Sequence, residues 1–261
     1  MNEILIFPPR FFVRHPTVNN FVELSYMADS FWVPLIRYIF NSVFVSVLGT
    51  VGHLLLSSMA AYPLARHPFP GHHWIKQVVV LSLLFTASVT YLPQYVVMSQ
   101  LKLINTYGAL ILPALQSSLG LYLMMNFMGT IPEEMLEAAR IDGAGEWRIL
   151  FTIVLPMSLP MIATMALLIG LGYWNDWKNG LYYLTDSRLY SIQNMLNQML
   201  KDVQFLKSGA DSSAAAELTQ DMPSVGIKMA IAVIGALPIM IIYPFFQKYF
   251  VKGITIGAVK G

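Results

Sequence analysis

The sequence predicts an all-α membrane protein, a polytopic bundle of transmembrane helices, from its composition and from the placement of its charges. Hydrophobic residues make up 56% of the 261 residues and charged residues only 11%, against about 25% in a soluble domain. Five long windows contain no Asp, Glu, Lys or Arg, namely 38–65, 77–101, 103–132, 149–175 and 229–247. Because about 20 apolar residues in a helix cross the core of a bilayer, each window is long enough for one span.

Each window predicts one helix, and the residues at its ends indicate where it stops. We expect helices over 36–62, 74–98, 107–128, 156–177 and 225–250. Pro63 should end the first of them, since proline lacks the N–H that continues a helix, and Pro68 and Pro70 follow in a short turn.

The segments around the spans divide the chain into three parts. Residues 1–36 form an N-terminal segment, 37–250 the transmembrane domain, and 251–261 a tail. Within the domain, 130–155 is amphipathic and 178–223 is a long polar loop. Lys and Arg in the short loops weakly favour 130–155 in the cytoplasm, which places the polar loop outside and the tail inside. With five spans and a tail inside, the N-terminal segment must lie outside, yet no span in this sequence carries it across the membrane. Either one window is miscounted or a further span precedes this sequence.

Residues 130–155 are predicted to form a short helix, a turn and a second short helix. Thr130 offers a hydroxyl cap, Pro132 lies in the first turn, and Glu133 lies near the positive end of the helix. Gly143 permits a turn that a side chain would obstruct. The segment therefore presents a compact surface, either to another protein or, as the alternative, to the plane of the bilayer.

The same segment contains a spaced motif. The positions of EAA-x3-G-x9-I-x-LP are occupied by Glu137, Ala138, Ala139, Gly143, Ile153, Leu155 and Pro156. This spacing resembles the signature of the permease subunits of bacterial carbohydrate ABC importers of the maltose-permease type. Residues 247–261 and the sequence WNDW at 174–177 resemble the same family.

The resemblance implies a fold and a set of partners. The fold is that of a type I ABC importer, with five spans in this chain and the family's N-terminal span absent from it. The implied partners are a second homologous permease, two ATP-binding subunits, an extracytoplasmic sugar-binding protein and the lipid bilayer of the bacterial inner membrane. The residues expected to couple to an ATP-binding subunit are Glu137, Ala138, Ala139, Arg140, Asp142, Gly143, Ile153, Leu155 and Pro156.

Polar and aromatic residues within the spans are candidates for the path of a sugar. These residues are Tyr91, Gln94, Tyr95, Gln116, Tyr173, Trp174, Asn175 and Asp176. Aromatic faces with amide and carboxylate partners suit sugar rings, which combine apolar faces with many hydroxyl groups. The alternative for each residue is an interfacial anchor or a hydrogen bond between helices.

Several classes of function are disfavoured by what the sequence lacks. There is no cysteine for a disulfide or a thiolate metal site, and we expect no metal site, no cofactor in this chain and no binding of nucleic acid. The chain contains no G-x-x-x-x-G-K-[ST] phosphate loop, so ATP hydrolysis is expected on separate subunits. A secondary transporter would need ionisable groups within its spans, and a membrane-embedded enzyme would need a nucleophile or metal set there. The sequence therefore favours an ATP-driven importer subunit for oligosaccharides.

Overall fold

The computed structural model describes residues 18–22, 33–85, 87–115, 117–208, 229–230 and 232–245, and every regular element in these ranges is helical. The all-α prediction is therefore confirmed. Gln116, the tail 251–261, residues 209–223 of the polar loop and most of the N-terminal segment lie outside the described residues.

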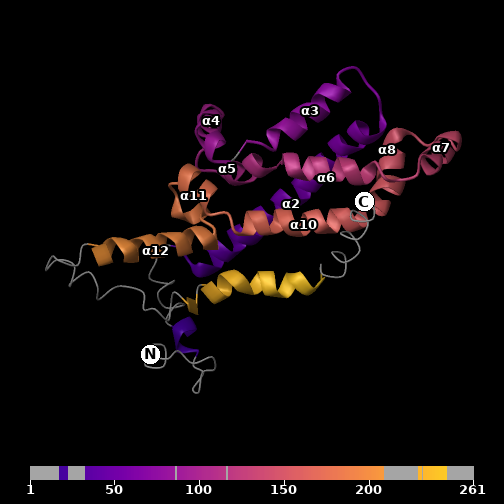
Figure 1. The fold of residues 1–261 in the computed structure, drawn as a ribbon. Coiled ribbons are helices and arrows are strands. Elements are labelled where there is room, and N and C mark those ends of the chain that lie inside the picture. The colour runs from indigo at the N-terminus through magenta and orange to yellow at the C-terminus, as the bar shows by residue number, and fades with distance from the viewer. Residues whose placement is uncertain are drawn as a thin grey trace.

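The described helices form a bundle with a cluster of short elements at each end. The longer helices are α2 (Leu35–Arg66), α3 (His72–Ser82), α4 (Ala87–Gln100), α6 (Ser118–Met128), α10 (Leu159–Trp174), α12 (Ile192–Ser208) and Ala232–Phe245. The shorter ones are α5 (Tyr107–Ile111), η1 (Leu112–Ala114), α7 (Glu133–Ile141), α8 (Glu146–Ile149), the π-helix η2 (Leu150–Val154), α9 (Leu155–Met157), α11 (Lys178–Tyr183) and η3 (Ser187–Leu189). Figure 1 shows α7 and α8 at one end of the bundle and α11 and α12 at the other.

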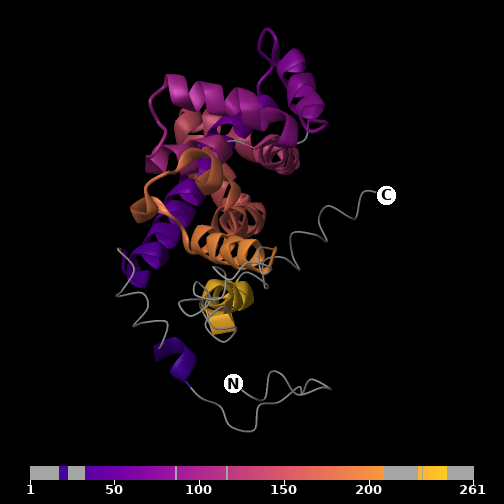
Figure 2. The same cartoon turned by 90° about the vertical axis from the view of Figure 1, so that its left-hand side faces the viewer.

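Helix α2 is the central element, because it packs chiefly against α10 and α6. Its 32 residues extend over about 48 Å at 1.5 Å per residue. Among the described residues it alone is long and apolar enough to cross a bilayer, and two bent helix pairs would also qualify if each were one span. Figure 2 looks nearly along α10 and Ala232–Phe245, which shows that the axes of these two helices are nearly parallel.

The prediction of continuous helices is wrong in the second and third windows. The second is divided into α3 and α4, and the third into α5, η1 and α6. In the fourth window the predicted helix 156–177 is present as α10, which follows Glu146–Met157 after a bend of 78°. Pro63 also fails to end α2, which continues through it to Arg66. The windows are apolar throughout, so their interruptions are not visible as changes in hydropathy.

The interruptions have local causes in serine and proline. The Ser82 hydroxyl donates to the carbonyl of Val79 at 2.6 Å and to Ser118 Oγ at 2.5 Å, so it competes with the backbone at the end of α3. Ser117 caps α6 by accepting a hydrogen bond from the Gly120 N–H. In the fourth window, Pro156 and Pro160 flank the bend at Ser158.

The polar loop contains more structure than the sequence indicated. Residues 178–208 form α11, η3 and the 17-residue helix α12. One face of α12 is buried, because Ile192, Met195 and Met199 pack with Trp174 in a second apolar cluster. This part of the loop is therefore folded onto the bundle.

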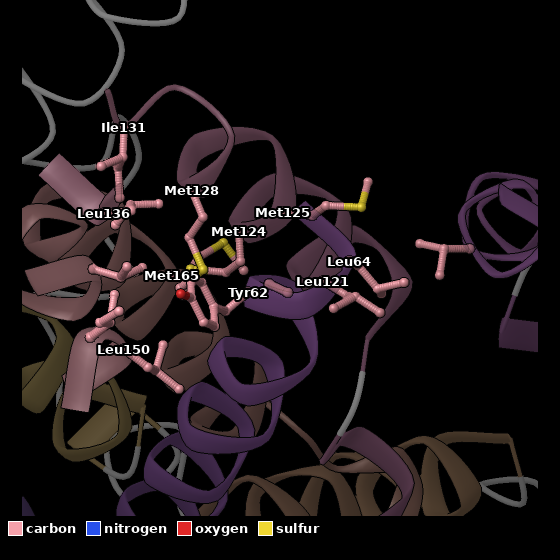
Figure 3. Packing of buried hydrophobic residues seen from close by; sticks show 14 residues of the cluster. Tyr62, Leu64, Leu121, Met124, Met125, Met128, Ile131, Leu136, Leu150 and Met165 are labelled. Carbon is pink, nitrogen blue, oxygen red and sulfur yellow. The ribbon is translucent and has the colours of Figure 1, made fainter. Parts of the chain in front are cut away.

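The largest apolar cluster lies at the end of the bundle that carries α7 and α8. Figure 3 shows Met124 and Met128 of α6 close to Tyr62 of α2, with Leu136 of α7 and Leu150 of η2 in the same cluster. Met124, Met128 and Leu136 are fully buried. The segment that contains α7 and α8, residues 133–149, is called the α7–α8 loop, and it is anchored in the core of the bundle.

Candidate functional site

The α7–α8 loop begins with a helix that lacks the predicted hydroxyl cap. Pro132 occupies the N-cap position of α7 and makes no side-chain capping bond, whereas the Thr130 hydroxyl donates to the carbonyl of Phe127 at 2.8 Å. The prediction of a Thr130 cap is therefore wrong. Glu133 and Glu134 lie in the first turn as expected, where negative charge stabilises a helix.

The turn after α7 explains the spacing between the alanines and the glycine of the motif. The Gly143 N–H donates to the carbonyl of Arg140 at 3.0 Å, and the Ala144 N–H donates to the carbonyl of Ala139 at 2.9 Å. These two bonds define a Schellman motif, in which the residue at the Gly143 position adopts a left-handed conformation. Gly143 has a φ of +78°, which strongly favours glycine.

The inner side of the loop is packed and its outer side is exposed. Leu136 is fully buried, and Ala139 and Ala144 pack against the same core cluster. Ile153 and Leu155 are partly buried and pack against the same cluster. The α7–α8 loop is therefore a folded unit, not a flexible connection.

Four charged residues join the loop to the end of α2, and we refer to Arg66, Glu133, Arg140 and Glu146 as the charged clasp. Arg66 pairs with Glu133 at 2.9 Å, and Arg140 pairs with Glu133 and with Glu146 at 3.0 Å each. Arg66 also donates to the carbonyls of Met128 and Ile131. Hydrogen bonds to Glu133 and then to Glu146 raise the pKa of Arg140 above its ordinary value.

Tyr62 and His67 extend the charged clasp. The Tyr62 hydroxyl donates to Glu146 Oε2 at 2.6 Å, and His67 Nε2 lies 3.2 Å from the same oxygen. Sequence reasoning did not identify His67 as part of this site. The Arg140 guanidinium points into the clasp, where its carboxylate partners are Glu133 and Glu146.

The residues on the outer side define the exposed face of the loop, which consists of Met135, Glu137, Ala138, Ile141 and Trp147. Ile141 is 86% exposed and Trp147 is 63% exposed. Asp142 and Gly143 are exposed beside them, and Pro156 is exposed further along the chain. Large apolar side chains held out from a folded unit are typical of a contact surface.

At the opposite end of the bundle, most of the predicted path residues surround two cavities. Tyr91, Tyr173, Asn175 and Asp176 line a cavity of about 340 Å³. Tyr91 and Tyr95 line a second one of about 430 Å³. The two cavities share Tyr91, Trp177 and Lys178, so α4 and α11 form their common wall.

Three predicted path residues do not belong to these cavities. The Trp174 side chain turns the other way, donates from Nε1 to the carbonyl of Gly235 at 2.7 Å, and lines a separate apolar cavity of about 270 Å³. Gln94 lines neither of the two cavities. Gln116 lies outside the described residues.

Asp176 orients the start of α11. Its Oδ1 accepts from the backbone N–H groups of Lys178 and Asn179 at 3.1 Å each, and its Oδ2 accepts from Asn179 Nδ2 at 2.6 Å. Burial raises the pKa of the Asp176 carboxyl above its ordinary value, and the hydrogen bonds from Asn179 oppose that rise. Sequence reasoning missed Lys178, which directly follows the sequence WNDW, and Tyr182, which lies five residues after Trp177.

Asn105 ties α11 to the connection between α4 and α5. Its Oδ1 accepts from the N–H groups of Thr185 and Asp186 at 2.9 Å each, and its own N–H donates to the carbonyl of Tyr183 at 2.9 Å. His53 lies deeper in the bundle, where it is fully buried and contacts the carbonyl of Ala114 through Nδ1 at 3.2 Å. Within the described parts of the chain, no group of three His, Cys, Asp or Glu side chains is placed to hold a metal ion.

Comparisons with known proteins place these features in one family. The family model for the binding-protein-dependent transport system inner membrane component matches residues 16–256. Protein LplC of Bacillus subtilis is 39% identical over 84% of this chain and 72% of its own length. The polygalacturonan/rhamnogalacturonan transport system permease protein YtcP of the same species is 37% identical over 94% and 88%. The arabinooligosaccharides transport system permease protein AraQ of Halalkalibacterium halodurans is 33% identical over 94% and 80%.

A solved structure agrees with these relatives. A crystal structure of a bacterial ABC transporter involved in the import of the acidic polysaccharide alginate contains a chain that superposes with a TM-score of 0.70. The two chains are 26% identical, and the match covers 82% of this chain and 74% of that one. The matches support an importer subunit over a secondary transporter or a membrane enzyme, and they confirm the type I importer fold. The chain belongs to the family of inner-membrane components of binding-protein-dependent transport systems.

Proposed function

We propose that this chain is one of two homologous permease subunits of an oligosaccharide importer and that its α7–α8 loop contacts an ATP-binding subunit. The observation that carries this proposal is the exposed face of the loop, where Ile141 of α7 and Trp147 of α8 project from a loop held by the charged clasp. A helix resting on a bilayer has Lys and Arg on its polar face. The polar residues around this face include the carboxylates of Glu134, Glu137 and Asp142, which favours a protein partner.

The remaining partners follow from the division of labour in such a complex. ATP is bound and hydrolysed on two separate ATP-binding subunits, since this chain has no phosphate loop. An extracytoplasmic sugar-binding protein delivers the substrate, and the second permease completes the path. Closure of the ATP-binding subunits moves α7, and the charged clasp passes that movement to α2, shifting the bundle between outward-facing and inward-facing states.

The orientation and the substrate complete the proposal. The α7–α8 loop and the tail 251–261 face the cytoplasm, and the polar loop 178–223 and the N-terminal segment 1–36 face outward. The names of YtcP and AraQ, which refer to polygalacturonan, rhamnogalacturonan and arabinooligosaccharides, support an oligosaccharide as the substrate. The aromatic and amide lining of the two cavities supports it as well.

Cysteine crosslinking tests the contact directly, because the native chain has no cysteine. In the assembled importer, Ala138→Cys should crosslink to an ATP-binding subunit that carries a cysteine in its docking surface. Leu181→Cys is the matched control, since Leu181 is exposed on α11 at the other end of the bundle, and it should give no such product. Labelling of Ala138→Cys only by a lipid-soluble reagent would show that the helix rests on the bilayer and would contradict the proposal.

A further inference from the structure

The two cavities at the α11 end share an aromatic wall and one cation. The larger is lined by Tyr91, Leu92, Tyr95, Trp177, Lys178 and Tyr182. The rings of Tyr91 and Tyr182 lie 5.2 Å apart. Lys178 is the one charged residue among those that line this larger cavity, so the cavity combines aromatic faces with a single positive charge.

Lys178 forms no ion pair with a carboxylate within the described parts of the chain, although the Asp176 carboxylate lies close enough to attract it. Asp176 lies nearby and lines the smaller cavity, but three N–H donors already occupy its two oxygens. Its carboxylate therefore holds the start of α11, and the Lys178 ammonium keeps its three donors for water or for a ligand.

We propose that these cavities select saccharides that carry a carboxylate, with the Lys178 ammonium binding the carboxylate and the rings of Tyr91 and Tyr182 covering the faces of the sugar. The proposal rests on the proposed function of the chain as an oligosaccharide permease, and it names the class of oligosaccharide. A cation beside apolar walls attracts an anion more strongly than one in bulk water, because the local dielectric constant is lower.

One carboxylate matches this site better than a phosphate group. A phosphate carries up to two negative charges and three acceptor oxygens, whereas the cavities offer one ammonium group. The two N–H groups at the start of α11 are already bonded to Asp176. The larger cavity therefore has one charged residue, Lys178, and one set of free donors, which suits a uronic acid.

Uptake into proteoliposomes tests the proposal with two saccharides that differ only in charge. The assembled importer is supplied with its binding protein loaded with a galacturonate trisaccharide or with the neutral methyl ester of that trisaccharide. Lys178→Gln should lower initial uptake of the acid about fivefold relative to the wild type. That factor corresponds to the upper range of the free energy contributed by an accessible ion pair. It should change uptake of the ester by less than about twofold, and Lys178→Arg should keep the preference. Each variant is compared with the wild type on the same saccharide, so any preference of the binding protein for one of the two saccharides cancels.

Lys102→Gln is the matched control, because Lys102 is exposed in the connection that Asn105 ties to α11, and it lines neither cavity. It should leave both uptake rates unchanged. Equal loss of both saccharides in Lys178→Gln, or loss of neither, would overturn the inference and leave the permease function intact. A wild-type complex that imports a neutral oligosaccharide but not the acid would do the same. A wild-type complex that imports no oligosaccharide would instead overturn the proposed function.

Discussion

The two ends of the bundle are built by different interactions. At the α7–α8 end, four charged residues pair with one another, and the large apolar side chains of Ile141 and Trp147 project outward. At the α11 end, amide and carboxylate groups bond mainly to backbone groups, and the aromatic side chains line cavities. The first end exposes large apolar side chains beside a set of ion pairs and the second has aromatic cavities, which suits contact with a protein at one end and passage of a substrate at the other.

Helix α2 joins these ends, because polar side chains anchor it at both. Tyr62 and Arg66 belong to the α7–α8 end. At the other end, Asn41 Nδ2 donates to the carbonyls of Arg188 and Tyr190 at 2.8 and 2.9 Å, and Asn41 Oδ1 accepts from the Tyr107 hydroxyl at 2.7 Å. A continuous helix anchored in this way transmits a displacement along its length, together with α10, which packs on it and leads from the α7–α8 end to α11.

The largest effect is expected from removing Arg66. Its side chain is only 11% exposed and bonds Glu133 and the carbonyls of Met128 and Ile131. Arg66→Ala leaves these acceptors without their donor, which should cost about 3 kcal/mol and detach the α7–α8 loop from α2. We expect a lower midpoint of thermal unfolding for the complex in detergent and loss of coupling between ATP hydrolysis and uptake.

Arg148→Ala is the control for this prediction. Arg148 is exposed in α8 and makes none of the ion pairs of the described residues. Its removal should leave the unfolding midpoint and coupling unchanged. Equal midpoints for the Arg66 and Arg148 variants would show that the charged clasp does not hold the loop.

A smaller effect is expected at Gly143, where glycine is favoured by the backbone conformation and not by a lack of space for a side chain. A Cβ placed on Gly143 or on Gly145 would meet no other atom within 4 Å. Gly143 has a φ of +78°, whereas Gly145 has an extended backbone with a φ of −72°. Gly143→Val should therefore cost about 1–2 kcal/mol of backbone energy and reduce coupled transport, whereas Gly145→Val should be tolerated. Similar uptake by the two variants would refute the backbone explanation.

The sequence predicted the α7–α8 end better than the α11 end, for a physical reason. The Schellman turn is local, so a fixed spacing between Ala139 and Gly143 specifies it. The all-α class also follows from local composition. Arg140 stays a predicted coupling residue, and its ion pair with Glu146 was not foreseen, because Glu146 comes within reach only after the chain turns at Gly143.

The features that sequence reasoning missed depend on contacts between distant segments. The interruption between α3 and α4 involves the bond from Ser82 to Ser118, residues in different helices. Trp174 and Asp176 are two residues apart but face different cavities, since the chain leaves α10 at Asn175. Helix α12 lies outside the five long charge-free windows, so composition does not predict it. Its apolar face is evident only from its packing on the bundle.

The smallest effect is expected at Asn105, which tests whether the α11 end is independent of the α7–α8 end. Asn105 has a φ of +64°, so Asn105→Gly removes the side chain without straining the backbone. The N–H groups of Thr185 and Asp186 lose their acceptor, and since the site is exposed the cost should stay below about 1 kcal/mol. Amide hydrogen exchange should speed up at Thr185 and Asp186, while crosslinking of Ala138→Cys to the ATP-binding subunit stays at its original level. Asn105→Asp keeps the acceptor and should preserve slow exchange. If Asn105→Gly also weakened the crosslink, the α11 end would not be independent of the α7–α8 end, because Asn105 bonds the end of α11 and the short connection to Asp186.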